Sequence, residues 1–217
     1  MVRLKKQVME LEKLNKQLKE EAVCARCEAL NEMGANMGLG KAQGDGLPRE
    51  PEKYTLQGHR GKITKLVLHP FYNIVASASE DATIRLWDYD SGEQERALKS
   101  HTGIVNFLAF NPNGKQLASC STDLSIKLWN LETYSVQKTL NGHEHEVSAV
   151  AYLSNGDYLL SCSRDQSIKF WDTISGYCLT TLAHGHTEWI RRIAVNHSSS
   201  LFASASKDET ICVWNLD

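Results

Sequence analysis

Hydrophobic and polar residues alternate in short runs along the chain from residue 54 onward, a pattern typical of β-strands with one buried face. In residues 63–88, Pro70–Asn73 separates the first two runs and Glu80–Ala82 forms a tight turn before the third. A further run near Glu95–Leu98 predicts an outer strand. We therefore expect, ahead of that outer strand, three strands at Ile63–His69, Ile74–Ser79 and Thr83–Asp88.

The same succession of runs recurs four times with fixed landmarks. A Gly-His or Ser-His pair recurs at intervals of 42, 42 and 43 residues, and each histidine is followed by an aspartate after 22 residues and a tryptophan after 28. This period resembles that of the WD repeat, which builds β-propellers with four strands to a blade. The sequence thus predicts an all-β WD-repeat propeller region over residues 53–217, with repeats at about 54–95, 96–137, 138–180 and 181–217 that each span two blades.

Histidine, serine and aspartate recur together in every repeat, so two interpretations compete. A Ser-His-Asp hydrolase needs one strained, exposed serine beside an oxyanion hole, whereas the set occurs here four times and no GxSxG sequence is present. Hydrogen bonds that satisfy polar groups buried in each blade explain the repetition directly. In the WD family the histidine contacts a serine of the second strand, and that serine contacts the indole. We therefore predict four structural sets: His59, Ser77, Asp81 and Trp87; His101, Ser119, Asp123 and Trp129; His143, Ser161, Asp165 and Trp171; His186, Ser204, Asp208 and Trp214, with Ser79, Ser121, Ser163 and Ser206 as the alternative serines.

Residues 1–30 follow a seven-residue period without Gly or Pro, which predicts a short N-terminal helix. Asn15 at a seam position favours a paired, in-register dimer. The alternative is a single amphipathic helix that lies on the chain's own domain. The predicted dimerisation residues of the coiled coil are Leu4, Val8, Leu11, Asn15 and Leu18.

Residues 31–52 contain five glycines and two prolines, a composition that interrupts regular structure. We expect this segment to be a flexible linker between the helix and the repeats. A dimer formed by the helix would then carry two independently oriented repeat regions.

Composition narrows the classes of function. The 217 residues include 24 basic and 26 acidic ones, a net charge of −2, which does not favour nucleic-acid binding through a basic surface. No run approaches the ~18 apolar residues of a membrane span, and the N-terminus lacks the apolar block of a secretory signal. The Cys24 and Cys27 pair has no second pair or nearby histidine to complete a zinc site. We expect a soluble intracellular protein with no metal, no cofactor, no nucleic-acid partner and no membrane insertion.

One aromatic and basic group falls outside these structural sets. In WD propellers one face is lined by the residue before the turn aspartate and by the third and fifth residues after the histidine. In the last two repeats these positions place an indole beside guanidinium groups, a composition typical of interface hot spots. The alternatives are that the indole packs under a loop or that the arginines bind a phosphate-bearing ligand. The predicted partner-binding residues are Arg164, Trp189, Arg191 and Lys207.

Several segments resemble the lissencephaly protein family, also called nuclear distribution proteins: RLKKQVMELEKLN, PEKYTLQGHRGKIT, SCSRDQSIKFWD and HTEWIRR. The resemblance implies a dimeric, non-enzymatic cytoplasmic regulator of the dynein motor that is associated with microtubules and centrosomes. The resemblance also implies that Arg164 and Arg191 match the arginines with which the family's propeller contacts the motor domain. Nuclear-distribution-E-type adaptors and the catalytic subunits of a platelet-activating-factor acetylhydrolase are further implied partners. The alternatives are a general WD-repeat adaptor for another assembly and a non-catalytic subunit of that acetylhydrolase.

The sequence also departs from that family. The family places a Lis-homology dimerisation motif before the coiled coil and has a seven-bladed propeller, whereas this sequence begins with the coiled coil and contains four repeats. We expect the four repeats to be part of a seven-bladed propeller. By the phase of the repeat, Thr55–Gln57 is an outer strand of the last blade, and its pairing there would close a four-bladed ring. Without that pairing a sheet edge stays open.

Overall fold

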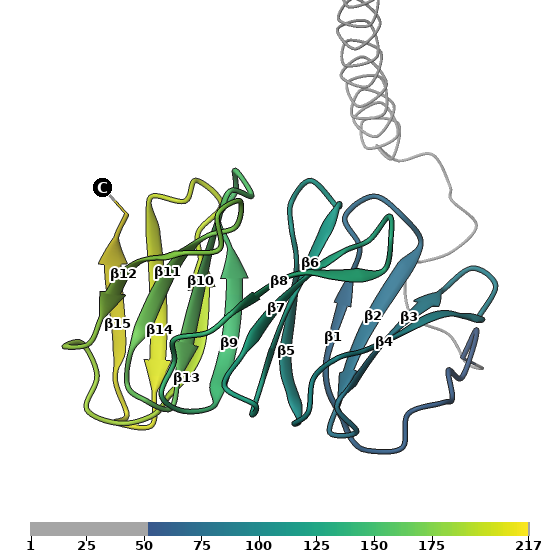
Figure 1. Cartoon of the computed structure of the whole chain (residues 1–217), viewed down its shortest axis with the longest axis horizontal. Helices are drawn as coiled ribbons and strands as arrows, with labels where there is room; N and C mark the ends of the chain where they lie inside the picture. The colour runs from purple at the N-terminus through teal and green to yellow at the C-terminus, as the bar shows by residue number, and fades with distance from the viewer. Residues whose placement is uncertain (1–51, 217) are drawn as a thin grey trace, which may run out of the picture. The chain divides into compact units, whose positions relative to one another are not determined.

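The computed structural model of the protein describes residues 52–216, which form four antiparallel sheets standing side by side (Figure 1). Three sheets hold four strands in chain order and the last holds three. The strands are β1 (Ile63–Leu68), β2 (Ile74–Ser79), β3 (Thr83–Asp88) and β4 (Gln94–Lys99); β5 (Val105–Phe110), β6 (Gln116–Ser121), β7 (Ile126–Asn130) and β8 (Ser135–Leu140); β9 (Val147–Tyr152), β10 (Tyr158–Ser163), β11 (Ile168–Asp172) and β12 (Cys178–Leu182); β13 (Ile190–Val195), β14 (Leu201–Ser206) and β15 (Ile211–Asn215).

The strands expected in the first repeat are confirmed, with one small difference. The first strand ends at Leu68, and His69 follows it with a buried ring. Its Nδ1 accepts hydrogen bonds from the backbone amides of Phe71 and Tyr72, and its Nε2 donates to the carbonyl of Gly114 in the next sheet at 2.8 Å. His69 therefore terminates the strand and ties two sheets together.

Each repeat spans two sheets, as the phase of the pattern predicts. The outer strand β4 pairs with β3 in the first sheet, although it directly precedes Ser100 and His101 of the second repeat. The same arrangement recurs at β8 and β12. Neighbouring sheets are thereby joined by the chain itself.

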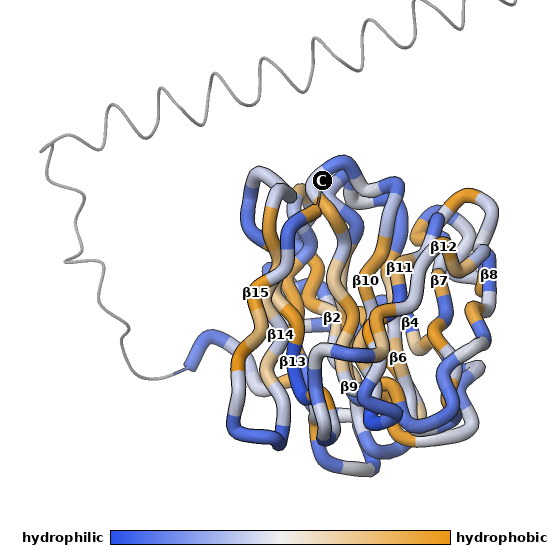
Figure 2. The backbone as a smooth tube through the Cα atoms, turned by 90° about the vertical axis from the view of Figure 1, so that its left-hand side faces the viewer, coloured by the Kyte–Doolittle hydropathy of each residue, from blue (hydrophilic) through white to orange (hydrophobic). Residues whose placement is uncertain are grey.

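Three hydrophobic cores lie between the four sheets, and Figure 2 shows hydrophobic positions along the strands and hydrophilic ones in most connecting loops. The core between the first two sheets joins Ile84 and Leu86 to Val105 and Leu108. The second and third cores repeat this arrangement one and two sheets further along. Sheet stacking therefore stabilises the fold, since each fully buried aliphatic side chain contributes ~1.5–3 kcal/mol.

Hydrogen bonds between sheets supplement these cores at both ends of the strands. At one end, the Asn106 amide donates to the carbonyl of Val147 in the next sheet at 2.8 Å, and the Thr64 hydroxyl donates likewise to Val105. At the opposite end, the Asn111 amide donates to the carbonyl of Gly156 at 2.9 Å. The sheets are thus held in register as well as packed.

The prediction that Thr55–Gln57 adds an outer strand to the last sheet is wrong, because this segment forms no strand and the last sheet has three. Tyr54, directly before it, lies against Gly92 and donates its hydroxyl to the carbonyl of Asp90 at 2.8 Å. These contacts hold the segment at the β3–β4 turn of the first sheet. The ring closure that depended on this pairing does not occur.

The predictions for the N-terminal coiled coil, residues 1–30, and for residues 31–51 of the linker lie outside the described residues. Within residues 52–216, no helix is long and apolar enough to cross a membrane.

Equivalent isoleucines should show how much sheet stacking contributes. Ile126 on β7 is fully buried between two sheets, whereas Ile211 occupies the same register position on β15 and is 73% exposed. Ile126→Ala should lower the free energy of unfolding by ~2–5 kcal/mol, and Ile211→Ala by less than ~0.5 kcal/mol. Urea denaturation of both variants measures this difference, and equal losses would contradict the assignment of the cores.

Candidate protein-binding face

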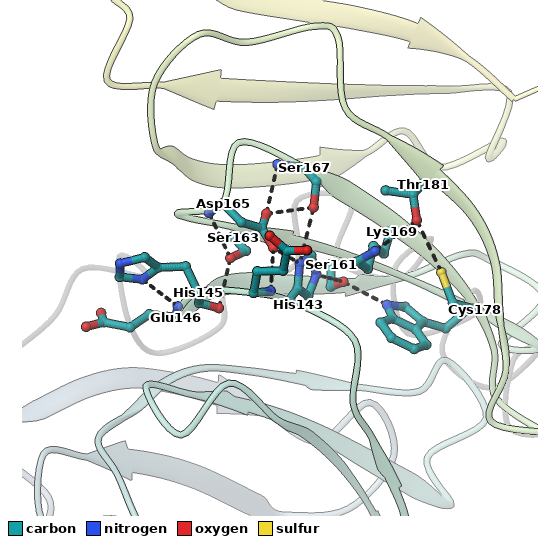
Figure 3. Close-up of polar contacts among 12 residues, drawn as sticks. His143, His145, Glu146, Ser161, Ser163, Asp165, Ser167, Lys169, Cys178 and Thr181 are labelled. Carbon is teal, nitrogen blue, oxygen red and sulfur yellow. Dashed lines mark hydrogen bonds and ion pairs between the residues drawn. The ribbon is translucent and has the colours of Figure 1, made fainter.

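Four equivalent hydrogen-bonded sets lie in the four sheets at the positions that the repeat spacing predicts. Histidine Nδ1 lies 2.7–2.9 Å from the aspartate Oδ2, and Nε2 lies 2.7–2.8 Å from the serine Oγ. The indole Nε1 donates to the same Oγ at 2.8–2.9 Å. The structure brings together all four residues of each predicted set, shown for His143, Ser161 and Asp165 in Figure 3.

The aspartate of each set fixes two loops at once. Asp123 accepts the backbone amide of Thr102, directly after the histidine, at 3.1 Å and the amide and hydroxyl of Ser125 at 3.0 and 2.6 Å. Leu124, between Asp123 and Ser125 in the chain, has φ of 69°, a left-handed conformation that is uncommon outside glycine. These bonds stabilise that turn and position the neighbouring surface loop.

The threonine or serine two residues after each aspartate is a further structural residue that the sequence did not lead us to expect. Its signal was the Asp-x-Thr or Asp-x-Ser sequence in every repeat. Each of these hydroxyls donates to the aspartate Oδ1 at 2.6 Å: Thr83, Ser125, Ser167 and Thr210.

Hydrogen bonds and burial together determine the pKa values in these sets, and burial also denies a substrate access to them. Burial by itself would raise the pKa of Asp123, but hydrogen bonds from Ser125 and His101 outweigh it and lower that pKa to about 2. Burial lowers the pKa of His101, although Asp123 opposes the shift. The four histidine side chains are at most 5% exposed. A substrate has no access to them, so the sets are structural and not catalytic.

The alternative serines bind the turns instead of the indoles. Ser79, Ser121, Ser163 and Ser206 each accept the backbone amide of the turn aspartate at 3.1–3.2 Å. Ser206 also donates to the carbonyl of Trp189 at 3.1 Å, which in turn accepts the amide of Lys207 at 2.9 Å. These bonds fix the loop that carries Trp189.

The four residues predicted to bind a partner meet around the Trp189 ring, and we call them the Trp189 cluster. The Lys207 Nζ lies 4.7 Å from the ring centroid, the Arg164 Cζ 4.8 Å and the Arg191 Cζ 5.9 Å. Trp189 is half-buried beneath these cations. Its indole is therefore neither freely exposed nor packed in the core, and the cations cover it.

Two carboxylates balance part of the positive charge. Arg164 pairs with Glu146 at 3.0 Å and Lys207 with Glu188 at 3.6 Å. Arg191 is exposed on β13 and forms no ion pair with any side chain of residues 52–216. Three cationic groups and two carboxylates leave the cluster net positive, so it suits an acidic partner surface.

Neighbouring residues in the sequence or at equivalent repeat positions contact other sheets and not Trp189. The guanidinium of Arg192 lies 5.1 Å from the ring of Phe107, away from Trp189. Thr64 and Asn106, equivalent to Arg191 in earlier repeats, are engaged in the sheet-to-sheet hydrogen bonds. Within residues 52–216, no group of three or more His, Cys, Asp or Glu side chains is placed to hold a metal ion.

Removing one hydroxyl tests the structural sets. Ser119→Ala should leave the buried Trp129 Nε1 and His101 Nε2 without partners and lower the free energy of unfolding by ~1–3 kcal/mol. Ser100→Ala, at an exposed position, is the matched control and should change it by less than ~0.5 kcal/mol. Chemical denaturation measures both, and a neutral Ser119→Ala would contradict the hydrogen-bond assignment.

The lowered pKa of Asp123 gives stability a specific pH dependence. An aspartate in the unfolded chain has a pKa of ~3.9, above the value of about 2 in the fold. Its stabilisation is thus present above pH ~4 and is lost as the pH falls towards the folded pKa.

Between pH ~2 and ~4, the wild-type protein takes up protons when it unfolds, and Asp123→Asn should reduce this uptake by about one proton per molecule. Denaturant titrations across this pH range measure the slope. Ser119→Ala retains the carboxylate, so it should lower the whole profile and keep the slope, and an unchanged slope in Asp123→Asn would contradict the prediction.

Comparison with known proteins finds four repeats in this chain. The model of the family described as "WD domain, G-beta repeat" matches residues 51–88, 92–130, 134–172 and 176–215. The chain is also similar to the Lissencephaly-1 homolog of Caenorhabditis briggsae, with 54% identity over 173 residues. That alignment covers 79% of this chain and 44% of the relative, so the aligned part spans less than half of that protein's length.

The family model covers most of the chain, and its four matches coincide with the four sets of hydrogen-bonded residues. The second match begins near β4 of the first sheet and ends with β7 of the second, in agreement with repeats that span two sheets. The chain belongs to the WD-repeat family as a non-catalytic member, and within that family it resembles the lissencephaly proteins.

Proposed function

We propose that this protein is a non-enzymatic scaffold that regulates the cytoplasmic dynein motor by binding the motor domain through the Trp189 cluster. The observation that carries the proposal is the convergence of Arg164, Arg191 and Lys207 on one half-buried indole. The similarity to a Lissencephaly-1 homolog supports this choice of partner. Such a scaffold would act in minus-end transport on microtubules, in nuclear migration and in the positioning of spindles and centrosomes.

The geometry suits binding better than chemistry. The indole provides a rigid apolar contact, and the surrounding cations provide directional hydrogen bonds to carboxylates. Because hydrogen bonds to the Trp189 carbonyl already hold the backbone of this loop, little loop entropy is lost on binding. An acidic surface of the motor domain would complete the partly neutralised charge of the cluster.

The proposal also includes a second copy of the chain and two classes of further protein partners. Dimerisation through residues 1–30 would present two Trp189 clusters in one particle and increase avidity for a partner with two binding sites. Nuclear-distribution-E-type adaptors and acetylhydrolase catalytic subunits are further proposed partners. The protein would accordingly be cytoplasmic and associated with microtubules and the centrosome.

A binding experiment tests the site. Arg164→Ala/Arg191→Ala should weaken capture of the purified dynein motor domain at least ~10-fold, because each hot-spot truncation costs ~2 kcal/mol or more. Arg96→Ala is the matched control, since Arg96 lies 5.3 Å from the ring of Tyr134, outside the Trp189 cluster. It should bind as wild type does.

Equal capture by the double variant and wild type would contradict the site. Capture of the motor by neither protein, with recovery of a ubiquitin ligase or a ribonucleoprotein from lysate, would favour the general adaptor function instead. Circular dichroism of each variant establishes that the fold is retained.

A further inference from the structure

A small cavity at the perimeter of the first sheet is lined by three cationic side chains and one carboxylate. Arg85 of β3 and Lys99 of β4 lie on the same face of the sheet, because Lys99 pairs directly with Thr83, two residues before Arg85. Arg60 reaches the cavity from the loop before β1, and Asp81 and Thr83 complete its lining. The volume is about 270 Å³, and we call this site the Arg85 cavity.

The carboxylate of the cavity leaves these cations unpaired. Asp81 accepts the backbone amide of Arg60 at 2.9 Å and the amide and hydroxyl of Thr83 at 2.9 and 2.6 Å. Within residues 52–216, no carboxylate forms an ion pair with Arg60, Arg85 or Lys99. Three cations and one carboxylate therefore give the cavity a net positive charge.

The second and third sheets pair a lysine with a threonine at the position of Arg85. The Lys127 Nζ donates to the Thr139 hydroxyl, directly opposite on the next strand, at 3.4 Å. Lys169 donates in the same way to Thr181 at 2.9 Å, and Figure 3 shows these two residues on neighbouring strands. In both sheets the cation thus has an acceptor within its own sheet.

The first sheet has an arginine in place of the lysine and an alanine in place of the threonine. Ala97 lies directly opposite Arg85 and offers no side-chain acceptor. The guanidinium donates through Nη1 to the Gln94 side chain, and its buried Nε has no hydrogen-bond partner. A side chain at Gly58 would collide with Nη1, so this glycine leaves room for the guanidinium. Because buried polar groups are rarely left unpaired, the guanidinium lacks an acceptor that a bound anion would supply.

The cavity occupies a position that stays accessible where sheets stand on both sides. Lys127 and Lys169 are partly exposed, as Arg85 is, although each of their sheets packs against a neighbour on either side. Thr102 and Asn141, the second-sheet equivalents of the other two cationic residues, are exposed. Access to the cavity therefore does not depend on whether a further sheet lies beside the first.

We propose that the Arg85 cavity binds a phosphate monoester, whose oxygens accept hydrogen bonds from Arg85, Arg60 and Lys99. A guanidinium binds phosphate oxygens in a bidentate manner, and such charge-assisted bonds are about twice as strong as neutral ones. The cavity is smaller than the ~300–1,000 Å³ of pockets that enclose a drug-sized ligand. It therefore suits one phosphate group whose carrier extends into solvent.

Calorimetric titration of the full chain tests the ligand chemistry. The two probes are glycerol 3-phosphate and N-acetyl-phosphoserine amide, which represent a small metabolite and a phosphorylated side chain as the carrier. At least one should bind with one site per chain, whereas glycerol and N-acetyl-serine amide should not bind. Absence of binding by both phosphate compounds would overturn the proposal, as would equal binding of the compounds that lack phosphate.

A double substitution that conserves net charge locates the site. Arg85→Lys/Ala97→Thr reproduces the pair of the second and third sheets, which has an internal acceptor and no bidentate donor, so it should weaken binding at least ~10-fold. The reverse exchange, Lys127→Arg/Thr139→Ala, is the matched control. It should bind as wild type does, because the second sheet lacks the other two cations. Wild-type affinity in the Arg85 variant would overturn the proposal.

A single substitution at an exposed position keeps the test independent of folding. Lys99→Gln removes one cation at the surface and should weaken binding at least ~5-fold, with an unchanged thermal melt in the absence of ligand. Arg164→Ala/Arg191→Ala should bind the phosphate compounds as wild type does, because the Trp189 cluster lies on other sheets. Unchanged affinity in Lys99→Gln, or lost affinity in the double variant, would overturn the assignment to this cavity.

Discussion

Packing of one twisted sheet on the next is the interaction on which the rest of this structure depends. A small antiparallel sheet has two faces, and in this protein the inner sheets bury both of them against neighbours. Residues at the same register position of different sheets are therefore buried where a neighbouring sheet packs on them and exposed where none does. Ile126, which is buried, and Ile211, which is exposed, illustrate this difference. Stability and surface chemistry therefore follow from a sheet's place in the array as much as from its own sequence.

The hydrogen-bonded sets make this stacking compatible with a polar surface. Each serine satisfies an indole and a histidine that packing has removed from water, and each aspartate binds the loop next to that histidine. The four equivalent sets thus rigidify four loops, and the other side chains of these loops differ from one repeat to the next. The Trp189 cluster occupies one of these loops and its neighbour, so a rigid framework positions the proposed binding residues.

This division of roles explains how residues resembling a catalytic triad occur without catalysis. A histidine that is buried and bonded at both nitrogens has no remaining site for a substrate. The cations around Trp189, in contrast, lie at the surface, where a partner can reach them.

The sequence by itself determined the strands of the first repeat and the histidine, aspartate and tryptophan of the four sets, because these depend on local alternation and on residue intervals of fixed length. Only the structure decided which of the two candidate serines bonds to the histidine and the indole in each set. The sequence also selected Arg164, Trp189, Arg191 and Lys207 as neighbours, since equivalent positions of adjacent repeats lie side by side. Only the tertiary structure decided that Thr55–Gln57 stays with the first sheet and that Arg192 turns to Phe107. Those outcomes depend on contacts between residues far apart in the chain, which no local pattern encodes. The same holds for the exposure of Ile63 and Ile211, because burial depends on whether a neighbouring sheet is present.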